Sequence, residues 1–173
     1  MNSSRHYRCT GFARWWIFAP LSQQQLNAAC DEAKNQGLRT LVHAYKEPVR
    51  AATLAGCTEV EHGTLAPDDD LKLMAERGTH FDPQCGLFIE NYLQNGERYL
   101  GTQGYTAEGF AAMEKILPMD HEIVKHTAKT PGLKIVFGTD AVAGARGRNA
   151  EKGGVVYKNA ARGVIPLYAG VQP

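Results

Sequence analysis

Short apolar runs alternate with stretches of helical periodicity along the chain from Ser22 to Gly138. Ser22 and Gln25 form an S-x-x-Q capping box, which predicts a helix that begins there and stops at Gly37. Strands are expected in the β-prone runs at residues 38–44, 57–61, 79–82 and 133–138. Further helices are expected over residues 48–55, 67–77, 106–117 and 118–129, whereas residues 83–105 have no clear period.

Strands that alternate with helices predict an α/β fold, in which a parallel sheet is connected by right-handed crossovers. In such folds, binding groups gather at the carboxyl ends of the strands. His43, His62 and Asp140 each stand where an expected strand ends, in LVHAY, EVEHG and VFGTDA. We therefore expect these three side chains to converge at one edge of the sheet.

Two neutral imidazoles and a carboxylate are a suitable ligand set for Zn²⁺ or another first-row divalent metal. A catalytic metal of this kind lowers the pKa of a bound water to about 7 and stabilises a developing oxyanion. His43 and His62 are therefore candidate metal ligands, and Asp140 is a candidate ligand, proton acceptor or both. Each residue taken alone also has a simpler interpretation, because a histidine at a strand end is often only a hydrogen-bonded structural residue.

Composition and charge narrow the class of protein. Hydrophobic residues make up 43% and charged residues 21% of the 173 residues, which is typical of one globular domain. The formal net charge of +1 gives no electrostatic reason to expect nucleic acid or an anionic membrane as a partner. No apolar run approaches the ~18 residues of a membrane span. Because the four cysteines include no CxxC pair, we expect reduced thiols and a cytoplasmic location.

The ordered motifs LVHAY, EVEHG and VFGTDA, preceded by SQQQLNAACDEAKNQGL, resemble the C-terminal half of the catalytic domain of the metal-dependent amidohydrolase superfamily. The imidazolonepropionase-like and Xaa-Pro-dipeptidase-like branch is the most similar. The resemblance implies a partial (β/α)₈ barrel in which His43 ends strand five, His62 ends strand six and Asp140 ends strand eight. It also implies that the two histidines bind one metal of a binuclear pair, while Asp140 binds the other metal and acts as general base.

Two parts of the family's pattern are missing. The sequence contains no H-x-H, the pair that the family carries on its first strand, and Lys34 lies in an expected helix rather than at the family's bridging position. A complete (β/α)₈ barrel also needs ~250 residues. We therefore expect residues 22–149 to form a partial barrel that holds at most one divalent ion, with Zn²⁺ as the leading candidate. The segments 1–21 and 150–173 have no assigned structure.

The expected function follows from this resemblance. It is metal-assisted hydrolysis of a C–N bond in a small amide, cyclic amide or dipeptide-like substrate, with Tyr45 as a candidate substrate contact beside His43. His80 and Asp82 are expected near the same edge in supporting roles. The alternative is a catalytically inactive half-barrel that acts through self-association or a complementary chain.

Overall fold

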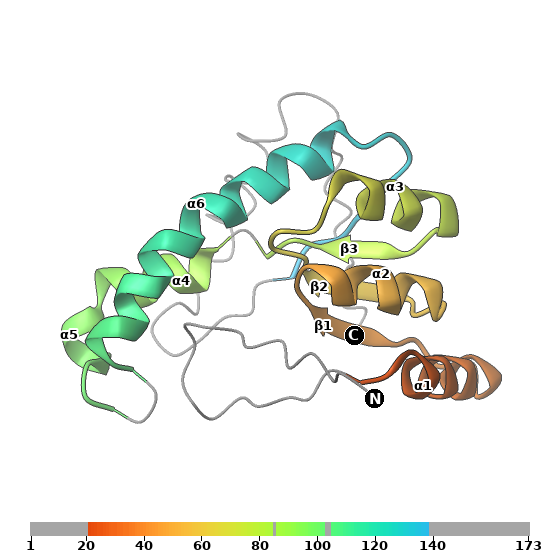
Figure 1. Ribbon diagram of the computed structural model, residues 1–173, viewed down its shortest axis with the longest axis horizontal. Helices are drawn as coiled ribbons and strands as arrows, with labels where there is room; N and C mark the ends of the chain where they lie inside the picture. Colours follow the sequence, from red (N-terminus) through yellow and green to blue (C-terminus); the bar gives the residue numbers. More distant parts are fainter. Residues whose placement is uncertain (1–20, 85, 103–104, 139–173) are drawn as a thin grey trace, which may run out of the picture.

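A computed structural model describes residues 21–84, 86–102 and 105–138 of the chain (Figure 1). Asp140 and the two end segments lie outside the described residues, so the predicted domain limits at 21 and 149 remain predictions. The described elements, in chain order, are α1 (Gln23–Asn35), β1 (Leu41–Ala44), α2 (Glu47–Leu54), β2 (Glu59–His62), α3 (Asp68–Arg77), β3 (His80–Asp82), α4 (Leu87–Gln94), α5 (Gly96–Tyr99), α6 (Ala107–Lys129) and β4 (Lys134–Ile135).

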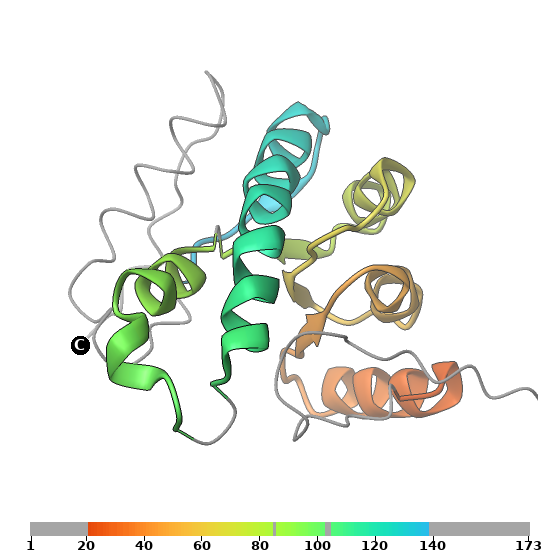
Figure 2. The same ribbon diagram turned by 60° about the vertical axis from the view of Figure 1, so that its left-hand side comes forward.

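The strands form one parallel sheet in the order β1-β2-β3-β4, which confirms the predicted α/β class. Each crossover contains at least one helix, and α2 and α3 lie alongside the strands that they connect (Figure 2). His43 pairs in register with Glu61, and Ala44 pairs with His62. The carboxyl ends of β1 and β2 therefore lie at the same edge of the sheet, as a parallel sheet requires.

The hydrophobic core lies between the sheet and the helices that cover it. Val60 and Phe81 extend from β2 and β3 toward side chains of α2 and α3, and the buried cluster includes Val49, Ala52, Leu71 and Met74. Side chains alternate between the two faces of a strand. Glu59, Glu61 and Asp82 consequently lie on the opposite face, which in a complete barrel is the interior.

The helix boundaries illustrate local sequence rules and one exception. The capping box is present as predicted: the Ser22 amide donates to Gln25 Oε1 at 2.9 Å, and the Gln25 amide donates to Ser22 Oγ at 3.2 Å.

The prediction of two helices over 106–117 and 118–129 is wrong, because α6 is a single helix with Pro118 in its interior. Buried residues on both sides of the proline, Met113 and Ile123 among them, pack the two halves against the rest of the protein. This packing outweighs the hydrogen bond that proline removes.

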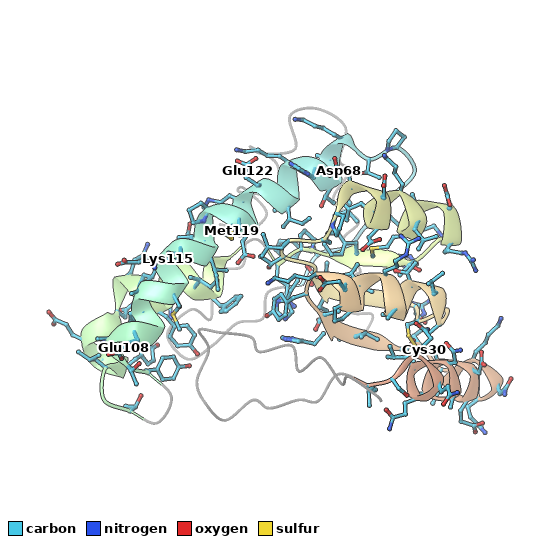
Figure 3. All side chains as sticks on the ribbon, viewed as in Figure 1. Cys30, Asp68, Glu108, Lys115, Met119 and Glu122 are labelled. Carbon is cyan, nitrogen blue, oxygen red and sulfur yellow. A yellow bond between two sulfur atoms is a disulfide. The ribbon has the colours of Figure 1, made fainter. Side chains whose placement is uncertain are left out.

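Cys30 of α1 and Cys57, which precedes β2, form a disulfide (Figure 3). The prediction of reduced thiols is therefore wrong for these two cysteines. They lie 27 positions apart, and only the packing of α1 beside α2 brings them together. Disulfides are rare in reducing compartments, so the predicted cytoplasmic location stays a prediction. Among the described helices, none combines the length and apolar character needed to cross a membrane.

We expect the disulfide to form in protein purified under oxidising conditions. A peptide map of unreduced protein should contain a species that links the peptides of Cys30 and Cys57, and reduction should split it. Recovery of both cysteines only as free thiols would contradict the assignment.

Candidate active site

The two predicted histidine ligands lie side by side at the carboxyl edge of the sheet. His43 is next to last in β1 and His62 is last in β2, and their ring centroids are 4.2 Å apart with an interplanar angle of 72°. His43 is exposed, whereas His62 is 4% exposed. One imidazole thus faces solvent while the other is held within the protein.

Aromatic rings fix the position of His62. Tyr45 stacks on it with centroids 5.0 Å apart and planes 25° apart, and also contacts the edge of His43 at 4.8 Å. Phe88 of α4 approaches His62 at 6.1 Å. Tyr45 is thus placed beside both histidines. Phe88 was not predicted, because it lies within residues 83–105, a stretch without clear periodicity.

The backbone at the end of β2 has an uncommon conformation. His62 has φ of +66° and Gly63 has φ of +62°, both in the left-handed region. This region costs a residue with a side chain roughly 1–2 kcal/mol, and such strain persists mainly where the surroundings fix the conformation. A Cβ on Gly63 would run into Cε2 and Cζ of Phe81. The glycine of EVEHG is therefore required by both its φ and its close approach to the core.

The third predicted ligand, Asp140, lies outside the described residues. The described chain ends nearby in sequence at Gly138, where an added Cβ would run into Oδ2 of Asp82. Gly138 therefore lies directly against the carboxyl end of β3. Asp82 is buried and accepts a hydrogen bond from the Gln84 amide at 3.1 Å.

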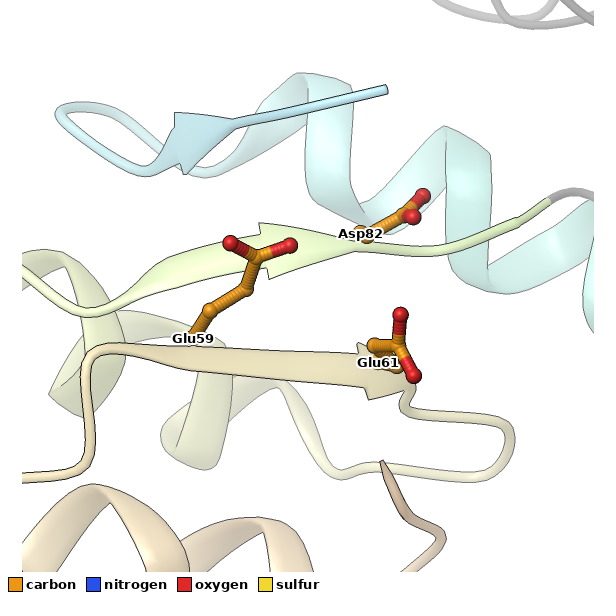
Figure 4. Close-up of side chains that lie close together, drawn as sticks. All are labelled: Glu59, Glu61 and Asp82. Carbon is orange, nitrogen blue, oxygen red and sulfur yellow. The ribbon is translucent and has the colours of Figure 1, made fainter. Parts of the chain in front are cut away.

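Three carboxylates gather on the barrel-interior face of the sheet (Figure 4). One oxygen each of Glu59, Glu61 and Asp82 lies within 4.8 Å of the others. Burial, followed by the charge of Asp82, raises the pKa of Glu59, although His80 and Arg39 partly oppose the shift. Glu59 and Glu61 were not predicted as site residues. The alternation in TEVEH was the available signal, because it places both glutamates on the face away from Val60.

We expect Glu59→Gln to stabilise the fold near neutral pH. A carboxyl whose pKa is raised in the folded state contributes stability only at low pH, and this stability is lost as pH rises through the folded-state pKa. The advantage of the glutamine variant should therefore disappear below ~4.3, the usual glutamate pKa, where the carboxyl is protonated in both states.

Thermal unfolding with EDTA at several pH values measures this effect. The control is Glu114→Gln, which changes an exposed glutamate of α6. An equal gain for Glu59→Gln at acid and neutral pH would contradict the assignment.

The donor chemistry of His43 and His62 suits a divalent transition metal, because imidazole nitrogens are common ligands of Zn²⁺. Their ring centroids lie 4.2 Å apart, so the two imidazoles are neighbours. The acidic cluster offers only carboxylate oxygens, a donor set that suits Mg²⁺, Ca²⁺ or Mn²⁺ better. The two groups of side chains are therefore chemically distinct.

Comparisons with known proteins agree with the fold. The chain is similar to a Xaa-Pro dipeptidase whose structure contains bound methionine in the active site, with a TM-score of 0.68 and 25% identity over 80% of this chain and 33% of that one. It is also similar to ochratoxinase of Aspergillus niger, with 29% identity over 129 residues, or 73% of this chain and 25% of that protein. An uncharacterized protein of Mycobacterium tuberculosis is 40% identical over 76 residues, which make up 43% of this chain and 20% of that protein. No family model matches the chain.

These similarities show that the chain has the fold of part of an α/β barrel, and the similar proteins include a dipeptidase and an ochratoxinase. More specifically, it is related to the amidohydrolase superfamily, as the sequence motifs predicted, and has the fold of part of that family's barrel. The chain spans about a third or less of the length of the proteins it matches.

Proposed function

We propose that this chain binds one divalent metal ion, with Zn²⁺ as the leading candidate, and hydrolyses C–N bonds in small amide or dipeptide-like substrates. The observation that supports the proposal most strongly is the contact between His43 and His62 at the carboxyl edge of β1 and β2. When bound there, the metal would supply a water of lowered pKa and would polarise the substrate carbonyl.

The chain's own residues have separate roles in this proposal. His43 and His62 hold the ion, and the ring of Tyr45 stacked on His62 limits how that imidazole can turn. Asp140 would complete the ligand set and accept the proton of the attacking water at its carboxylate, as general base. Tyr45 would contact the substrate beside the exposed His43.

The names of the relatives suggest which substrates to test. An Xaa-Pro dipeptide and ochratoxin represent the Xaa-Pro dipeptidase and the ochratoxinase to which the chain is similar. Hydrolysis should require added Zn²⁺, stop with EDTA and fail in His62→Ala. Hydrolysis that continues unchanged in His62→Ala would contradict the proposal.

A second candidate role is association with a complementary chain or a second copy of this one. Within the described part of the chain, β1 and β4 each pair with only one strand, and Leu41 of β1 is 59% exposed. Unpaired strand edges readily pair with another chain. Light scattering coupled to size-exclusion chromatography distinguishes an enzyme that works alone from a chain that associates. A stable monomer that hydrolyses substrate would have no need of a partner.

A further inference from the structure

The loop after β2 contains three left-handed residues within four positions. They are His62, Gly63 and Leu65, with φ values of +66°, +62° and +64°. Two of them carry side chains and therefore disfavour this conformation. Contacts from the rest of the protein must hold the loop in place, and with it the imidazole of His62.

Thr64 is one of two anchored residues of this loop, since the Gly63 amide also donates to the Ala44 carbonyl at 3.0 Å. Its carbonyl accepts a hydrogen bond from the Lys46 amide at 3.1 Å, which ties the loop to the chain just after β1. Its hydroxyl donates to Oδ1 of Asp120 on α6. Both side chains are buried, at 5% exposure for Thr64 and 4% for Asp120. The loop is thus fastened through Thr64 to two other parts of the fold.

Asp120 itself is closely packed between elements. A Cβ added to Gly86, at the start of α4, would lie 3.4 Å from the Cβ of Asp120 and 2.8 Å from Cδ1 of Leu117. The carboxylate therefore sits at a point where α6, the segment before α4 and the loop after β2 meet. A buried carboxylate at such a point can hold its hydrogen-bond donor in one orientation.

We propose that Asp120, acting through Thr64, is a positioning residue that orients His62 for metal binding. This inference rests on the proposed metal site. Partners that orient a metal-binding histidine typically change metal affinity by about 10–100-fold when removed. We place Thr64 and Asp120 in that class, although they reach His62 through the loop backbone and not through its ring.

The test is Zn²⁺ affinity, measured by competition with a chromophoric chelator. Thr64→Val, which removes only the hydroxyl, should weaken binding by about 10–100-fold, and Thr64→Ser, which restores it, should recover the wild-type affinity. The matched control is Thr127→Val on α6, because the Thr127 hydroxyl is also buried and donates to the Ile123 carbonyl at 2.6 Å. This control should lose thermal stability but keep its affinity for Zn²⁺.

A double-mutant cycle tests whether Asp120 acts through Thr64. Asp120→Ala combined with Thr64→Val should bind Zn²⁺ no more weakly than the poorer single variant. If Asp120→Ala does not fold, the Zn²⁺ affinities of Thr64→Val and Thr64→Ser still test whether the Thr64 hydroxyl orients His62. Equal affinities for Thr64→Val and Thr127→Val would overturn this inference alone. Wild-type affinity in His62→Ala, or no Zn²⁺ binding by wild-type protein, would overturn the metal site and this inference with it.

Discussion

Replacing Gly63 by alanine is expected to lower the free energy of unfolding by about 2–5 kcal/mol. The estimate combines roughly 1–2 kcal/mol for a side chain in the left-handed region with about 1–3 kcal/mol for overpacking against a filled core. Phe81, whose ring the new methyl would meet, is fully buried and cannot move aside freely. Urea denaturation of the wild type and the variant measures the difference.

Gly56→Ala is the matched control. Gly56 has a similar φ of +73°, but a Cβ there would meet nothing within 4 Å. This variant should therefore lose only the conformational part, roughly 1–2 kcal/mol. An equal loss for both variants would show that the approach of Gly63 to Phe81 has no energetic consequence.

Replacing His62 by alanine is expected to weaken Zn²⁺ binding by more than the ~100-fold that loss of a supporting residue typically costs, because a direct ligand is removed. His43→Ala should have a similar effect. The control is His126→Ala on α6, since the His126 ring lies at 2.6 Å from the Asp68 carboxylate of α3 and not against the two site histidines. Competition titration provides the measurement.

The outcomes separate the two groups of candidate ligands. Loss of affinity in His43→Ala and His62→Ala, but not in His126→Ala, supports the histidine site. Unchanged affinity in both site variants would reject it. Loss of affinity in Glu61→Gln alone would instead locate the ion at the carboxylate cluster.

The sequence was sufficient to predict that His43 and His62 meet. Both stand at the end of a β-prone run, and the crossover between the runs is long enough for one helix, so parallel pairing brings the two ends to one edge. The motif EVEHG also includes Gly63, the glycine that follows the histidine. What the sequence could not reveal was the reason for this glycine, because Phe81 is a neighbour only in the folded sheet.

The parts that were missed depend on tertiary contacts. Cys30 and Cys57 come together because α1 packs beside α2, and no spacing rule predicts that pairing. Pro118 suggested a break between two helices, yet buried residues on both sides keep α6 continuous. The bond from Thr64 to Asp120 spans 56 positions, and nothing in the local pattern around either residue indicates it.

The acidic cluster was missed for a different reason. The strand TEVEH carries two separate signals, the histidine at its end and the face that its two glutamates share, and the prediction rested on the first alone. Because Glu59 and Glu61 alternate with Val60, a barrel interpretation already required them to face the interior. The structure adds that Asp82, which was already expected near this edge, is the register partner of Glu61 on the neighbouring strand.

Anomalous diffraction from a crystal of the Zn²⁺-loaded protein tests the central claim most directly. The account predicts a peak at the zinc edge at about 2.0–2.1 Å from one nitrogen of each ring, His43 and His62. A peak among Glu59, Glu61 and Asp82 with none at the histidines would contradict it, as would the absence of any peak in a crystal grown at saturating Zn²⁺.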